Sequence, residues 1–142
     1  MPDCSFYAKA RAGFPQLVTC WRHKADATDE RALIILSDTA RLMEYSPPET
    51  PIAPEQLATW SALGALVPLW LIKALVFLMT QMPARPSPHS ETEAAAWVYG
   101  WLRLRTYTSP EEARARIPAH LQAALTPLIA AGWEDLTLQR LA

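Results

Sequence analysis

The segment Cys20-Trp21-Arg22-His23 carries the residues best suited to chemistry in this 142-residue chain. It places a thiol and an imidazole three residues apart, which on a helix is one face. Joined by Cys4, His89 or His120, the pair would suggest a tetrahedral zinc site, and alone it would suggest a nucleophile beside a base. A second close pair of ligands is missing, so no compact zinc module is matched. An enzyme or metalloprotein using Cys20 and His23 is therefore only a low-weight alternative.

Neighbouring glutamates are the other candidates for chemistry, as pairs of carboxylates: Glu91 with Glu93, and Glu111 with Glu112. Each pair follows a serine that can cap a helix, so capping and the positive helix N-terminus already account for the acids. No general acid–base pair is predicted. The chain is expected to act without catalysis, and we assign it no catalytic residue, metal or cofactor.

The six tryptophans are the most unusual feature of the composition. Trp97 and Trp101 are spaced four apart and share a helix face. Aromatic and arginine residues dominate interaction hot spots, and aromatic rings can also stack the bases of single-stranded nucleic acid. The simpler alternative is that the tryptophans form the core face of their helix. The predicted interaction surface comprises Trp97, Trp101, Arg103, Arg105 and Tyr107.

Composition bounds the class of protein. Hydrophobic residues make up 51% of the chain and charged residues 19%, which excludes global disorder and allows one domain over residues 1–142. The net charge of −1 supplies no field for nucleic acid, so that partner is not expected. Thirteen prolines, four glycines and no asparagine disfavour β-hairpins. The abundance of Ala, Leu, Arg and Pro suggests a bacterial source.

Cysteine usage and the first residues predict the compartment. Cys4 and Cys20 are too few for a disulfide framework, and Met1-Pro2-Asp3 lacks the basic start and apolar run of a signal peptide. A cytoplasmic protein with free thiols is the expectation, and association with the inner membrane is the alternative.

Helix signals recur along the chain. An amphipathic helix is predicted over 29–45, capped by Asp26 or Thr28, and further helices are predicted to start at Ser90 and at Ser109. Proline-rich surface loops are predicted near 46–54 and 83–90. Breaks are expected at Gly13-Phe14-Pro15, at Pro127 and at Gly132. Residues 101–108 alternate like a strand, but a helix to about Arg105 is favoured.

The segment Trp60–Met82 is apolar enough to pose a choice between buried core and membrane span. Pro68 lies four residues after Gly64, which predicts a kinked helix or two helices end to end. Lys73 lies near the middle, where an unpaired ammonium disfavours a span. Buried core is preferred, with Lys73 expected to reach a helix edge or to meet an acid such as Asp38 or Glu44.

These features together predict an all-α protein, a single-domain helical bundle or orthogonal array of about six to eight helices around a central, kinked, apolar helix. The predicted function is non-enzymatic protein–protein interaction, as an adaptor, a secretion or assembly accessory, or an immunity-type partner. Another protein or a second copy of the chain is the expected partner. The alternative is a membrane component anchored by a span near 60–82.

Overall fold

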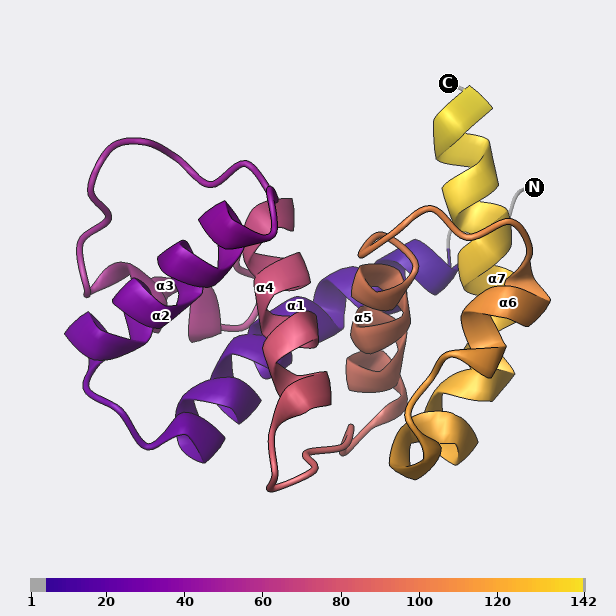
Figure 1. Cartoon of the computed structure of the whole chain (residues 1–142), viewed down its shortest axis with the longest axis horizontal. Helices are drawn as coiled ribbons and strands as arrows, with labels where there is room; N and C mark the ends of the chain where they lie inside the picture. The colour runs from indigo at the N-terminus through magenta and orange to yellow at the C-terminus, as the bar shows by residue number, and fades with distance from the viewer. Residues whose placement is uncertain (1–4, 142) are drawn as a thin grey trace. The chain divides into compact units, whose positions relative to one another are not determined.

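The computed structural model describes the backbone of residues 5–141 and the side chains of residues 6–139. Over this range the chain forms helices and loops without any strand, so the all-α prediction is confirmed (Figure 1). The helices are α1 (Ser5–Ala25), α2 (Asp29–Leu42), α3 (Gln56–Ser61), α4 (Leu69–Gln81), α5 (Glu91–Trp101), α6 (Pro110–Ala115), the 3₁₀ turn η1 (Ala119–Leu121) and α7 (Gln122–Leu141).

Hydroxyl side chains start three of these helices, because each accepts a hydrogen bond from an amide that has no partner inside the helix. Thr28 Oγ1 accepts from the Arg31 amide at 3.2 Å and starts α2. The Oγ atoms of Ser90 and Ser109 accept at 3.1 Å from the amides three residues ahead and start α5 and α6. The predicted starts of these helices are confirmed, although α2 and α5 end several residues earlier than expected.

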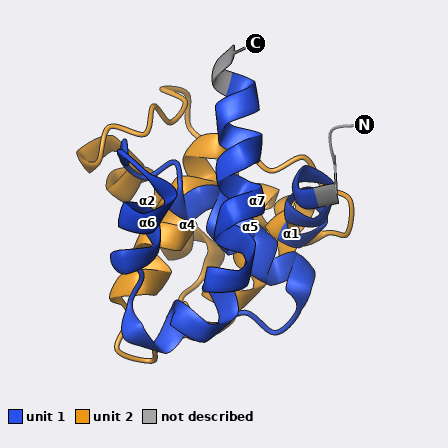
Figure 2. Cartoon of the chain, turned by 90° about the vertical axis from the view of Figure 1, so that its right-hand side faces the viewer, with its two compact units in different colours: residues 1–13, 87–142 blue, residues 14–86 orange. Residues whose placement is uncertain are grey.

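The chain divides into two compact units (Figure 2). Unit 1 comprises residues 1–13 and 87–142, and in it α5 and α6 both pack on α7. Unit 2 comprises residues 14–86, and in it α2 packs on α4. Helix α1 contributes residues to both units. The prediction of a single domain stays a prediction.

The break expected at Gly13-Phe14-Pro15 is wrong, since α1 runs unbroken through all three residues. Within unit 1, a Cβ at Gly13 would lie 2.1 Å from the backbone oxygen of Thr92 and 3.0 Å from the Cβ of Ala96. The glycine therefore allows a close approach between α1 and the start of α5 rather than a turn.

The breaks expected at Pro127 and Gly132 are wrong for a similar reason. Helix α7 continues through both residues to Leu141. A Cβ at Gly132 would lie 2.7 Å from Val98 Cγ1 and 3.0 Å from both Leu102 Cδ1 and Phe6 Cζ. The glycine again removes volume where helices of unit 1 meet.

The central apolar segment is not one kinked helix. Helix α3 ends at Ser61, and α4 starts only after Pro68, so the alternative of two helices is closer to the structure. Gly64 lies in the connection with a φ of 82°. Lys73 is half-buried and its Nζ lies 5.5 Å from the centre of the Tyr45 ring, so an aromatic face takes the place expected for Asp38 or Glu44. Among residues 5–141, no helix combines the length and apolar character needed to cross a bilayer.

Candidate functional site

A groove in unit 2 is the best-formed candidate site. It has a volume of about 360 Å³ and lies between one face of α2 and the proline-rich segment that follows the helix. This volume is at the lower end of ligand pockets and suits one or two side chains of a partner. We call it the α2 groove, lined by Glu30, Leu33, Ile34, Ser37, Asp38, Arg41, Thr50, Pro51, Ile52 and Pro54.

The α2 side of the groove follows from helical spacing. The six lining residues of α2 recur at steps of three and one, which places them along one stripe of the helix. Leu33 is buried and forms a floor, whereas Ile34 beside it is 51% exposed. The exposed isoleucine beside the buried leucine gives the groove an accessible apolar surface.

The chain reverses sharply after α2 and so forms the other side of the α2 groove. The Tyr45 amide donates to Ala40 O at 2.8 Å and the Glu44 amide to Arg41 O at 3.2 Å, which is the Schellman pattern of a helix end. Glu44 occupies the left-handed position of this motif with a φ of 61°, and Ser46 also has a φ of 61°. Tyr45 is buried, and its ring faces Lys73 of α4. This contact holds the turn that follows α2 against α4.

Prolines make the returning wall stiff. Pro51 and Pro54 line the groove on either side of the half-buried Ile52. A proline has a fixed φ and no amide hydrogen, so this wall loses little freedom when a ligand binds. Figure 1 shows the segment running outward from the end of α2 and back to α3.

The rim of the groove is acidic. Glu30 is exposed and has no ion pair among the described residues. Asp38 pairs with Arg41 at 3.2 Å, but both side chains are more than half exposed, and such pairs contribute little. Two carboxylates against one guanidinium leave the rim suited to a positively charged group.

The aromatic residues of the predicted interaction surface lie in the interior. Trp97, Trp101 and Tyr107 are 0%, 6% and 4% exposed, which agrees with the core alternative weighed for the tryptophans. Trp101 Nε1 donates to Ala113 O at 3.0 Å, and the Trp101 and Tyr107 rings stack. The Nε1 atom of Trp97 has no hydrogen-bond partner among the described residues. Arg105 is exposed.

Arg103 is built into unit 1 rather than presented to a partner. Its side chain is 7% exposed, and its guanidinium carbon lies 3.5 Å from the centre of the Tyr99 ring. It donates to Tyr99 O at 3.0 Å, to Asp135 Oδ2 at 3.3 Å and to Gln139 Oε1 at 2.5 Å. These contacts tie the end of α5 to α7, so the arginine has a structural role.

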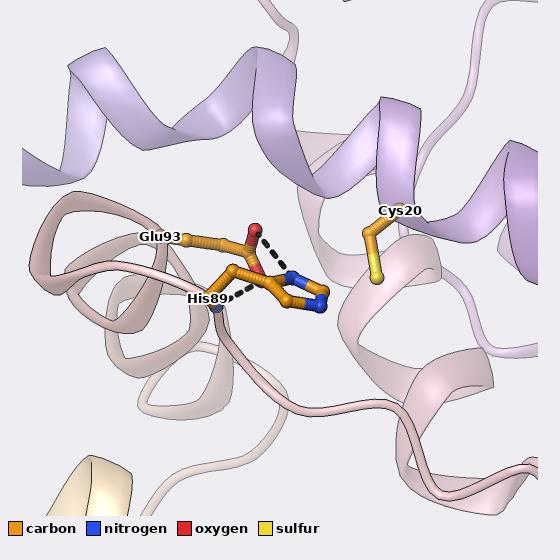
Figure 3. A group of neighbouring side chains, drawn as sticks. All are labelled: Cys20, His89 and Glu93. Carbon is orange, nitrogen blue, oxygen red and sulfur yellow. Dashed lines mark hydrogen bonds and ion pairs between the residues drawn. The ribbon is translucent and has the colours of Figure 1, made fainter.

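The glutamates considered for chemistry serve helix starts and ion pairs in unit 1. Glu91 forms an ion pair with Lys9 at 2.8 Å. Glu93 is 4% exposed; its Oε2 accepts from the His89 amide at 3.2 Å, and its Oε1 lies 3.6 Å from His89 Nδ1 (Figure 3). Glu112 Oε1 accepts from the Thr108 amide at 2.9 Å. Capping thus accounts for Glu93 and Glu112, as the spacing predicts.

The residues considered for a metal or nucleophile are distributed over the chain. Cys20 and His23 lie on the unit 2 part of α1, where the cysteine is buried and the histidine is exposed. His89 and His120 belong to unit 1, and Cys4 lies outside the described residues. Within either unit taken by itself, the described side chains form no group of three ligands close enough to share an ion.

Sequence reasoning missed the α2 groove. The apolar periodicity of residues 29–45 predicts an amphipathic helix, but nothing in it shows that Ile34 stays exposed beside the buried Leu33. The signal that was present is the density of prolines immediately after an amphipathic helix, which indicates a stiff segment able to return along it.

No family model, curated protein or solved structure matches the chain.

Proposed function

We propose that this protein acts without catalysis by binding a segment of a partner protein, and that the α2 groove takes an apolar side chain of that segment with a basic residue beside it. The observation that carries the proposal is the exposed Ile34 in a groove whose opposite wall is proline-rich. An adaptor or assembly accessory would work in this way.

Three properties of the groove support this type of partner. Ile34 and Ile52 offer apolar surface, and burying a side chain of this size contributes about 1.5–3 kcal/mol. The carboxylates of Glu30 and Asp38 favour a lysine or arginine at the rim. The proline wall is already ordered before binding, which lowers the entropy cost of association.

Selection of peptides from a random displayed library on the full chain tests the proposal. Enriched peptides are expected to share a Leu, Ile, Met or Phe next to a Lys or Arg. Their affinity for purified protein should fall at least about tenfold in Ile34→Glu, because the new charge would occupy the apolar surface. In Glu30→Gln the preference for the basic residue should weaken.

Leu138→Glu is the matched control, since Leu138 is 48% exposed against 51% for Ile34 but lies on α7 of unit 1. This variant should bind the selected peptides as the wild type does. Peptides without a basic residue, or equal loss of binding in both variants, would contradict the proposal.

A further inference from the structure

The connection between α3 and α4, residues 62–68, carries two strongly exposed apolar side chains. Leu63 is 92% exposed and Leu66 is 76% exposed, and Leu69 at the start of α4 is 43% exposed. Single exposed leucines are common, but three within residues 63–69 form a cluster of apolar side chains that a binding partner can cover. This leucine loop is separate from the α2 groove and shares no residue with it.

The backbone holds the leucine loop outward. The Ala62 amide donates to Thr59 O at 3.2 Å at the end of α3, and the Ala65 amide donates to Ala62 O at 3.0 Å. Between them Gly64 takes the left-handed conformation, with no neighbouring atom within 4 Å of a Cβ built there. The turn is thus formed by its own hydrogen bonds and lies in open space.

Two buried tryptophans anchor the base of the loop. Trp60 and Trp70 are each 7% exposed, and their rings meet edge to face with centres 6.0 Å apart. The leucines therefore project from a fixed base and have no pocket of their own to fill. Pro68 follows Leu63 and Leu66 and has no amide hydrogen. The backbone at the end of the leucine loop therefore has one fewer hydrogen-bond donor that would need water as a partner.

The chain on either side of the leucine loop is uncharged. No charged residue occurs from Gln56 to Ile72. At the end of α3, Arg22 Nη1 lies 3.1 Å from Ser61 Oγ, and the Arg22 charge is paired because its Nη2 lies 2.8 Å from Asp29 Oδ1. An uncharged apolar tip neither attracts nor repels a neutral partner, and its binding would not depend on salt.

The small size of the loop favours a lipid surface over a second copy of the chain. A stable protein interface needs about 800 Å² from each partner, which is far more than the two leucines of the loop and the neighbouring Leu69 can offer. A bilayer needs no matching patch, and its hydrated headgroup region leaves loop carbonyls in contact with water. We propose that the leucine loop inserts Leu63 and Leu66 into the interfacial region of a zwitterionic bilayer, which makes this a peripheral membrane contact.

Flotation of the full chain with phosphatidylcholine vesicles tests this proposal. The wild type is expected to float with the vesicles and to do so equally at low salt and at about 1 M NaCl. The double variant Leu63→Ser/Leu66→Ser should lower the partition constant at least about tenfold, because two apolar side chains would no longer enter the bilayer.

Leu42→Ser is the matched control, because Leu42 is 82% exposed but lies at the end of α2. It should leave flotation unchanged, and circular dichroism should show both variants folded. Absence of wild-type flotation, equal loss in the control, or a dimer in solution that the double variant dissociates would each overturn the proposal.

Discussion

The two units use glycine in opposite ways. In unit 1, Gly13 and Gly132 lie inside helices at points where a Cβ would collide with a neighbouring element. In unit 2, Gly64 lies in a loop with open space around it and a positive φ of 82°. Glycine thus provides close packing in the first unit and backbone conformation in the second.

The two units also differ in how many large apolar side chains they expose. Large apolar side chains are exposed in unit 1 only at Tyr7 and Leu138 among the described residues. In unit 2 they are exposed at Ile34, Leu42, Met43, Leu63, Leu66 and Leu69. Unit 1 thus has the character of a packed scaffold, whereas unit 2 carries both of the binding surfaces that we propose.

Gly13→Ala should have the largest effect on stability. Alanine favours a helix by about 1 kcal/mol over glycine, but here its Cβ would press on the backbone oxygen of Thr92. We expect a net loss of about 3 kcal/mol in the free energy of unfolding, measured by urea denaturation. Ala131→Gly, at an exposed position of α7, is the control and should lose only about 1 kcal/mol. A gain in stability for Gly13→Ala would show that unit 1 is not packed this closely.

Gly64→Ala should have a smaller effect, and for a different reason. Space is free around Gly64, so only the left-handed backbone opposes a side chain, at a cost of about 1–2 kcal/mol. Asparagine tolerates this conformation better, and Gly64→Asn should therefore lose less than Gly64→Ala in the same measurement. Equal losses in the two variants would indicate packing rather than backbone conformation, and the contrast with unit 1 would then fail.

Glu44→Gly should produce the smallest change, and it should be a gain. Glu44 occupies the left-handed position at the end of α2, where glycine is preferred, so the variant should gain about 1 kcal/mol in thermal or urea unfolding. Glu44→Ala removes the same charge from the negative end of the helix without relieving the backbone. If Glu44→Ala gained as much stability as Glu44→Gly, the gain would come from removing the carboxylate and not from relieving the φ angle.

Local signals predicted the helix starts well. The caps at Thr28, Ser90 and Ser109 depend only on residues within one turn, and all three are present. The proline-rich loop after α2 was predicted on the same local grounds. By contrast, α1 and α7 continue through Pro15 and Pro127, where local rules expected breaks.

The candidate site was harder to predict. A spacing of four placed Trp97 and Trp101 on one helix face, but the same spacing fits a core and a contact surface equally well. Arg103, an expected contact residue, is held by Tyr99 and Asp135 through contacts that join α5 to α7. Ile34 is 51% exposed although it follows the buried Leu33, and helical periodicity does not encode which residues beside an apolar stripe other elements will cover.

The sequence by itself determined the helical class and the helix starts, because hydrophobic periodicity and caps act over a few residues. It could not determine whether Gly13 and Gly132 break helices or allow them to meet, because the answer depends on atoms of Thr92 and Val98 far along the chain. The leucine loop shows the same limit. The run 60–82 is apolar apart from Ser61, Lys73, Thr80 and Gln81. Only tertiary packing decided that Trp60 and Trp70 are buried while Leu63 and Leu66 face outward.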